Sequence, residues 1–139
     1  MPDTAKVVVE DEPALIAGSA VVEDADGSVR LVGGACRACG LRMFPRAPVC
    51  PGCMSEDVAE EVMSDEGTLY AYTVVHVGPA KWRKPLAVGY VDLPNGVRVF
   101  AHLRGDLAIG RRMVLAADVV AQTPDGKDVR NFVFAEDAA

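Results

Sequence analysis

The four cysteines constrain the fold of this chain more than any other feature, because all of them lie between Cys36 and Cys53 as two C-x-x-C pairs. A C-x-x-C turn places two sulfurs on one side of a tight backbone loop, and two such loops that face each other supply the four thiolates of a tetrahedral zinc site. Gly40, directly after Cys39, suits such a loop because glycine tolerates a positive φ. We predict one closed structural zinc site with the ligands Cys36, Cys39, Cys50 and Cys53.

Two other uses of the same cysteines compete with zinc. A redox dithiol needs one C-x-x-C pair beside a strand-helix unit, and the sequence shows no such unit. A rubredoxin-like iron site uses the same four ligands, so only the lack of an electron-transfer context in the sequence favours zinc. Four thiolates leave no open coordination position, so we do not expect the metal to be catalytic.

Charge and composition limit the classes of function. The chain has 139 residues, half of them hydrophobic, which is enough for a buried core. Its formal net charge of -6 opposes contact with a phosphate backbone, so nucleic acid is not an expected partner. The first residues lack a signal-peptide pattern, and no apolar run reaches about eighteen residues. We expect a cytoplasmic protein without membrane contact, in a reducing compartment where paired cysteines hold a metal.

After the cysteine region, the sequence reads as successive strands separated by turn signals. Five strands are predicted, at 67–78, 85–93, 97–104, 112–122 and 129–136. The clearest hairpin is Leu93-Pro94-Asn95-Gly96-Val97, since Asn-Gly accepts left-handed conformations. Five strands with a long first member predict a closed barrel of the OB type, with a bend or bulge at Gly89. The link at 106–109 is too short for more than one helical turn.

The remaining segments complete the predicted organisation. An Asp-Gly turn within residues 19–33 predicts a hairpin before the cysteines, and the acidic segment 55–67 is expected to form a helical turn or a short strand. We therefore predict a mainly β chain with an N-terminal arm and hairpin at 1–33, a zinc ribbon at 34–62 and an OB-fold barrel at 63–139.

These motifs, in this order, resemble a known family, the zinc-ribbon plus OB-fold proteins associated with acyl-CoA metabolism, formerly a domain of unknown function. The resemblance runs from about Ala35 to Phe134. It rests on C-x-x-C-G, Phe44-Pro45-Arg46, Cys50-Pro51-x-Cys53, Ser55, the strand opening Gly67 to His76, Pro85 with LAVGYVDL, and Gly110. Two features depart from the family pattern: a hairpin is predicted where members often have a helical segment, and Phe44-Pro45-Arg46 has one proline fewer than the common motif.

The resemblance implies a partner rather than an independent activity. Such proteins bind thiolase-superfamily enzymes, including thiolases, aldolases and acyltransferases, which make or break carbon-carbon bonds in acyl-CoA thioesters. By this resemblance the chain is an accessory subunit of a hetero-oligomer. It is implied to carry one structural zinc ion and to help bind CoA, shape the acyl pocket or pass on an intermediate.

The residues themselves supply no catalytic set. All four cysteines are assigned to the metal, so no thiol remains as a nucleophile. His76 and His102 are the only histidines, and both are predicted in apolar strand settings where a structural or interface role is favoured over a general base. An enzyme that acts alone is therefore the third interpretation, after the accessory subunit and a nucleic-acid-binding protein.

Two clusters of basic residues are candidate contact sites. The loop 77–85 places Lys81, Trp82, Arg83 and Lys84 together, where they could receive the phosphates of CoA or contact a partner; the alternative is a solubilising loop whose tryptophan folds back over the core. Arg37, Arg42 and Arg46 surround the cysteines and are expected to offset the negative charge of a zinc tetrathiolate, with partner contact as the alternative.

The aromatic residues test the alternative function, a single-stranded nucleic-acid-binding OB-fold protein. Period-two alternation puts Tyr70 and Tyr72 on one face of the first barrel strand, and further rings occur at Tyr90, Phe100, Phe132 and Phe134. Base stacking needs exposed rings above a basic groove, and these strands carry few Lys or Arg residues. We therefore interpret the rings as barrel core.

Overall fold

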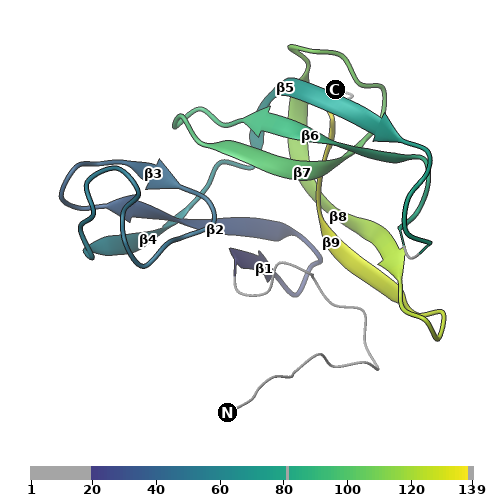
Figure 1. Ribbon diagram of the computed structural model, residues 1–139, viewed down its shortest axis with the longest axis horizontal. Coiled ribbons are helices and arrows are strands. Elements are labelled where there is room, and N and C mark those ends of the chain that lie inside the picture. Colours follow the sequence, from purple (N-terminus) through teal and green to yellow (C-terminus); the bar gives the residue numbers. More distant parts are fainter. Residues whose placement is uncertain (1–19, 81, 138–139) are drawn as a thin grey trace.

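A computed structural model describes residues 20–80 and 82–137, which form two connected β structures (Figure 1). The first is a small sheet of β1 (Val21–Glu23), β2 (Val29–Cys36), β3 (Arg42–Met43) and β4 (Val58–Val62). The second is a closed barrel of β5 (Glu66–Val75), β6 (Leu86–Asp92), β7 (Arg98–Arg104), β8 (Arg112–Gln122) and β9 (Asp128–Glu136). Within these described ranges, no helix has the length and apolar character needed to cross a bilayer.

The barrel has the strand order of an OB-fold. The order is β5-β6-β7-β9-β8, and the barrel closes where Gly67 in β5 pairs with Met113 in β8. All neighbouring strands are antiparallel except β7 and β9, which run parallel and pair His102 with Val133. The predicted five-stranded OB-type barrel is thereby confirmed, and each predicted strand overlaps an observed one.

Three hairpin turns share one sequence pattern and one geometry. Each has Asp or Asn followed by a glycine with φ near 89°, at Gly27, Gly96 and Gly126. In the β6–β7 turn the amide of Gly96 donates to the carbonyl of Leu93 at 3.1 Å, and the amide of Leu93 donates to the carbonyl of Val97 at 2.8 Å. Only the glycine has a positive φ, so the turn is the longer glycine-bulge type rather than the two-residue turn.

A β-bulge in β5 lies beside Gly89. Leu69 pairs with Val91 and Ala71 pairs with Tyr90, so Tyr70 is the extra residue. A Cβ at Gly89 would lie 2.1 Å from the carbonyl oxygen of Ala71. Gly89 is therefore required because the bulged strand approaches closely, but the bulge itself lies in β5 and not at Gly89, where it was predicted.

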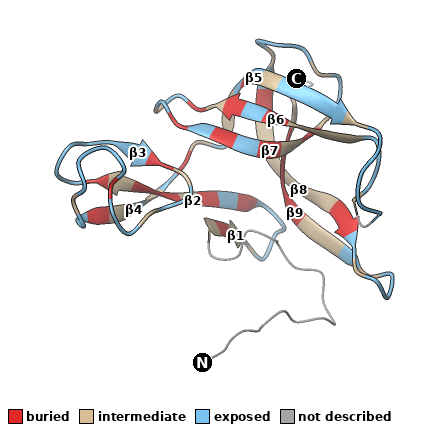
Figure 2. Cartoon of the chain, viewed as in Figure 1, coloured by how far each residue is buried: buried red, intermediate tan, exposed pale blue. Residues whose placement is uncertain are grey.

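The ribbon and the barrel share one hydrophobic core. Leu31 from β2 and Met63, after β4, are buried in the same cluster as Leu69 and Phe132 of the barrel. Phe44 meets Phe132 edge-on, with 6.0 Å between ring centroids, and Arg130 of β9 forms an ion pair with Glu23 of β1. Figure 2 shows buried segments along β2, and the shared core fixes the ribbon to the barrel rather than linking it flexibly.

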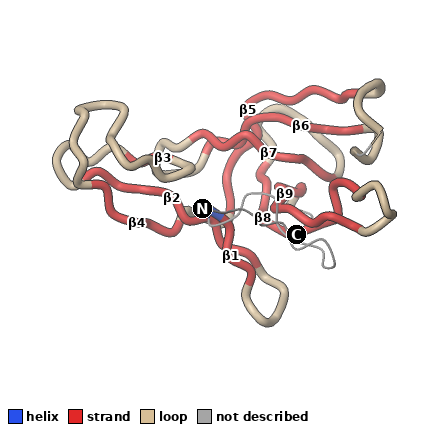
Figure 3. Tube along the Cα trace, turned by 60° about the horizontal axis from the view of Figure 1, so that its bottom comes forward, coloured by secondary structure: helices blue, strands red, loops and turns tan. Residues whose placement is uncertain are grey.

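Strand β2 spans the ribbon from end to end. It pairs with β1 at Val29–Leu31 and with β3 and β4 at Val32–Cys36. In the turned view of Figure 3, β2 and β4 extend sideways from the barrel and end in long loops. The acidic segment contains the strand β4, and the 105–111 link forms a turn with no helix. The predicted N-terminal arm lies outside the described residues.

Candidate metal centre and barrel surfaces

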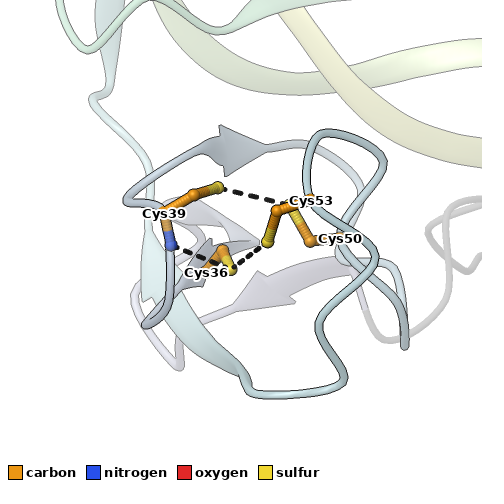
Figure 4. Close-up of side chains that lie close together, drawn as sticks. All are labelled: Cys36, Cys39, Cys50 and Cys53. Atoms are coloured by element: carbon orange, nitrogen blue, oxygen red, sulfur yellow. Dashed lines mark hydrogen bonds between the residues drawn. The ribbon is translucent and has the colours of Figure 1, made fainter.

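The four cysteines converge in the ribbon (Figure 4), where Cys36 and Cys50 belong to a small hydrophobic cluster that is separate from the core shared with the barrel. Their sulfur atoms all lie within 4.8 Å of one another, with 3.6 Å between Cys36 and Cys53 and 3.6 Å between Cys39 and Cys50. These separations fit four ligands around one ion with bonds of about 2.3 Å. The four cysteines therefore form the metal site of a zinc ribbon.

The two C-x-x-C loops have matching backbone geometry. The amide of Gly40 donates to the carbonyl of Cys36 at 2.9 Å, and the amide of Met54 donates to the carbonyl of Cys50 at 2.9 Å. The residue after each second cysteine has a left-handed backbone, with φ of 83° at Gly40 and 69° at Met54. Glycine adopts this conformation without strain, whereas methionine does not.

Hydrogen bonds and neighbouring sulfur atoms shift the pKa values of the Cys36 and Cys53 thiols in opposite directions. The amide of Cys39 donates to the sulfur of Cys36 and lowers the pKa of Cys36 to about 6, against the effect of burial. At Cys53 a backbone hydrogen bond from Ser55 also lowers the pKa, but the neighbouring sulfurs outweigh it and raise the pKa of Cys53 to about 12. The thiolate of Cys36 therefore forms readily, whereas that of Cys53 needs a bound cation. The donor set suits a closed structural ion that holds the two loops together.

The arginines near the cysteines are paired with carboxylates. The ion pairs are Arg37–Asp57 at 3.5 Å, Arg42–Glu61 at 2.8 Å and Arg46–Glu60 at 3.9 Å. Arg46 also donates to the carbonyl of Val58 at 2.7 Å. These side chains therefore link the ribbon strands, and the charge that they offer the metal site is shared with neighbouring acids.

The residues of the β5–β6 loop that were predicted to contact CoA or a partner lie in different environments, and Lys81 is outside the residues that the structure describes. Trp82 is half-buried against Val120, Ala121 and Val133, and its ring lies 5.4 Å from that of His102. Trp82 thus folds back over the barrel, as the alternative interpretation of the loop stated. Arg83 and Lys84 instead line a pocket at the end of the barrel.

The two histidines do not form a shared site. His76 follows the end of β5 and is exposed, which contradicts its predicted position in an apolar strand. His102 lies in β7 with its Nδ1 atom buried and without a hydrogen-bond partner. Burial, followed by the charge of Arg104, lowers the pKa of His102 and favours the neutral ring.

The prediction that all the aromatic rings belong to the barrel core is wrong for four of them. Phe132 and Phe134 are buried, but Tyr70, Tyr72, Tyr90 and Phe100 are exposed. The rings of Tyr90 and Phe100 pair across β6 and β7 at 5.3 Å, and Arg98 covers the ring of Tyr70 at 3.5 Å. We call Tyr70, Tyr90, Phe100 and Arg98 the aromatic surface.

The bulge also separates Tyr70 from Tyr72. Tyr72 pairs with Gly89 and lines the pocket at the barrel end together with Leu103, a core residue. The extra residue in β5 breaks the period-two alternation, so the predicted common face for the two tyrosines is wrong. The pairing of Tyr90 with Phe100 could have been predicted from the sequence, because the Asn-Gly turn fixes the register of β6 and β7.

Comparisons with known proteins agree with this architecture. Residues 27–59 match the family described as "ChsH2, rubredoxin-like zinc ribbon domain", and residues 60–118 match "ChsH2, C-terminal OB-fold domain". A solved structure described as an Ltp2-ChsH2(DUF35) aldolase is 31% identical, with a TM-score of 0.61, and the match covers 77% of this chain and 84% of that one. The chain belongs to the ChsH2 (DUF35) family. A DUF35 protein of Sulfolobus solfataricus shares the fold, with a TM-score of 0.52 and 18% identity over 78% of this chain and 76% of that one.

Curated relatives of this ChsH2-family chain include subunits of larger enzymes. The benzoylsuccinyl-CoA thiolase subunit BbsA of Thauera aromatica is 38% identical over 54% of this chain and 52% of the relative. A DUF35 domain-containing scaffold protein of Methanocaldococcus jannaschii is 36% identical over 50% of this chain and 51% of the relative. The matched segment thus spans about half the length of each curated relative.

Proposed function

We propose that the chain is a non-catalytic subunit that binds a thiolase-superfamily enzyme and supports carbon-carbon bond cleavage or formation on acyl-CoA thioesters. One observation carries the proposal: the chain matches 84% of a chain in a solved structure described as an Ltp2-ChsH2(DUF35) aldolase, at 31% identity. The similarity to a benzoylsuccinyl-CoA thiolase subunit points to the same class of partner. In this proposal the metal is zinc, which holds the ribbon in shape.

The arrangement of reactive groups supports an accessory role. The four thiols converge on one another, so each is used as a ligand rather than as a nucleophile. His102 stacks on Trp82, and His76 lies in a different, exposed position. A general base acts within hydrogen-bonding reach of a nucleophile, and the described residues place neither histidine against such a group. We therefore assign bond making and breaking to the partner.

The aromatic surface is the part of the barrel that best fits such a partner. Tyrosine, arginine and other large flat side chains dominate the energetics of protein interfaces. Arg98 donates to both carboxylate oxygens of Asp92, at 2.6 and 3.1 Å, so its charge is neutralised. A neutral apolar surface complements an apolar protein surface, whereas nucleic acid requires unneutralised cations. The net charge of -6 also disfavours nucleic acid.

Reconstitution tests the proposal. The purified chain and its thiolase-superfamily partner should elute together in size-exclusion chromatography, and acyl-CoA turnover should require both proteins. Tyr90→Ser with Phe100→Ser should abolish co-elution. Ile109→Ser is the matched control, because it removes an exposed apolar side chain from another part of the barrel and should leave the complex intact. Full turnover by the partner alone, or tight binding of single-stranded oligonucleotide by the chain, would contradict the proposal.

A further inference from the structure

Arg83 and Lys84, both in the described part of the chain, have no carboxylate within ion-pair distance, unlike the other arginines. Every arginine except Arg83 has a carboxylate within 4.0 Å: Arg30, Arg37, Arg42, Arg46, Arg98, Arg104, Arg111, Arg112 and Arg130. The side chain of Arg83 donates only to the carbonyl of Val119, at 3.2 Å, and the side chain of Lys84 donates only to the carbonyls of Pro79 and Trp82. Acidic residues outnumber basic ones in this chain, 20 to 14, so the exception is informative.

Arg83 and Lys84 line the same pocket, which has a volume of about 540 Å³. Its apolar wall includes Val74, Ala87 and Leu107, and no acidic residue lines it. The pocket lies beside the 105–111 link, whose residues Gly105 and Leu107 line it, and this link forms a turn and no helix. Core residue Leu103 also lines the pocket.

The geometry points to a binding site for an organic anion with an apolar body. We propose that Arg83 and Lys84 hold a carboxylate or phosphate group, while the body of the ligand packs against Val74, Ala87 and Leu107. The anionic group can belong to a free carboxylic acid or to the phosphates of a CoA thioester, since both offer the same acceptor oxygens. The site goes beyond the proposed function, because it lies within this chain and needs no partner to bind.

The backbone contacts of the two cations prepare them for this task. A guanidinium has five N–H donors, and the contact of Arg83 with Val119 uses one of its nitrogens. An ammonium has three donors, and the contacts of Lys84 with Pro79 and Trp82 leave one. Both side chains are thereby held in place without an ion pair to a carboxylate, although Arg83 also acts on Asp118 at longer range, and this restraint reduces the entropy lost when an anion binds.

The neighbouring cation Arg104 does not compete for the same role. Its Nε donates to Asp118 at 3.0 Å, and its terminal nitrogens donate to the carbonyls of Leu103 and Val119. The carboxylate of Asp118 also accepts a bond from the amide of Val119 at 2.7 Å. Asp118 is therefore hydrogen-bonded to other groups; it also interacts electrostatically with Arg83 but forms no ion pair with it, so the remaining N–H groups of Arg83 can bind a ligand.

Calorimetric titration of the purified full chain tests the site with four probes. Benzoate and hexanoate represent a free acid, adenosine 3′,5′-bisphosphate represents the phosphates of CoA, and inorganic phosphate lacks an apolar body. Binding of either acid, or of the bisphosphate, with weaker binding of inorganic phosphate, supports the site and identifies the source of the anion. No binding of any probe at millimolar concentration, or inorganic phosphate binding as tightly as the best organic probe, overturns it.

Variants locate the binding. Arg83→Gln with Lys84→Gln should weaken the best probe at least tenfold, and Arg30→Gln, on the β1–β2 hairpin, should leave it unchanged. Val74→Glu should also abolish binding, because it adds a carboxylate to the pocket while leaving both cations and their backbone contacts intact. Val74 is 40% exposed, so the barrel should tolerate this change. Unchanged affinity in both pocket variants would overturn the proposal.

Discussion

Gly89→Ala tests whether the bulge in β5 requires a glycine at position 89. The added Cβ would lie 2.1 Å from the carbonyl oxygen of Ala71, and real Cβ contacts essentially never fall under 3.0 Å. Both atoms belong to paired backbones, so β5 and β6 must separate by about 0.9 Å locally. Overpacking of this kind costs about 1–3 kcal/mol, and one or two weakened ladder hydrogen bonds add about 1 kcal/mol each.

A smaller effect opposes this loss. Replacing glycine by alanine stabilises the folded state by about 0.4–1 kcal/mol through the unfolded chain. We therefore expect Gly89→Ala to lower the free energy of unfolding by about 2–4 kcal/mol and the melting temperature by about 10 °C. Urea unfolding of the metal-loaded chain measures this change, with fluorescence of Trp82 as the probe because that side chain packs on the barrel.

Gly78→Ala is the matched control. The nearest atom to a Cβ there lies at 3.8 Å, so its stability should remain within about 0.5 kcal/mol of the parent chain or rise slightly. If Gly89→Ala also stays within 0.5 kcal/mol at an unchanged m value, the close approach of the two strands is not a constraint and the reasoning is refuted.

Three further predictions concern the ribbon and His102. Met54→Gly should raise stability by about 0.5–1 kcal/mol because it relieves a left-handed methionine, and Gly40→Ala in the matching loop should lower it by about 1 kcal/mol; a loss of stability in Met54→Gly or a gain in Gly40→Ala, measured by urea unfolding, would refute the symmetry of the two loops. Cys39→Ala should prevent stoichiometric metal binding and assembly with the partner, and an intact complex with merely slower turnover would contradict a structural role for the metal. Because the pKa of His102 is lowered, the contribution of its neutral ring to stability is complete above pH 6.5, the pKa of an unperturbed histidine, and is lost as the pH falls below that value. His102→Gln should therefore reduce the loss of stability between pH 7.5 and 5.5. A pH profile of stability identical to that of the parent chain would refute this.

The cysteine spacing and the turn signals made most of the fold predictable. Two C-x-x-C loops impose a local geometry whatever surrounds them, and Gly96 marks a turn through its positive φ. Such features depend on a few neighbouring residues, so the four ligands and the five barrel strands could be located from the sequence.

The orientation of the aromatic rings could not be predicted because it depends on contacts between distant residues. The bulge at Tyr70 arises where β5 pairs with β6, and one extra residue reverses which face each later side chain occupies. The position of Trp82 likewise depends on Val120 and Val133, which lie far away in the sequence. The missing ion pair of Arg83 becomes visible only when the other arginines are seen with their carboxylates.

The most direct test of the central claim is affinity purification of the tagged chain from its native cell, with mass spectrometry and metal analysis of the eluted fraction. We predict a thiolase-superfamily enzyme in stoichiometric amount and one zinc ion for each copy of the chain. Recovery of the chain alone, or with nucleic acid that nuclease removes, would contradict the account.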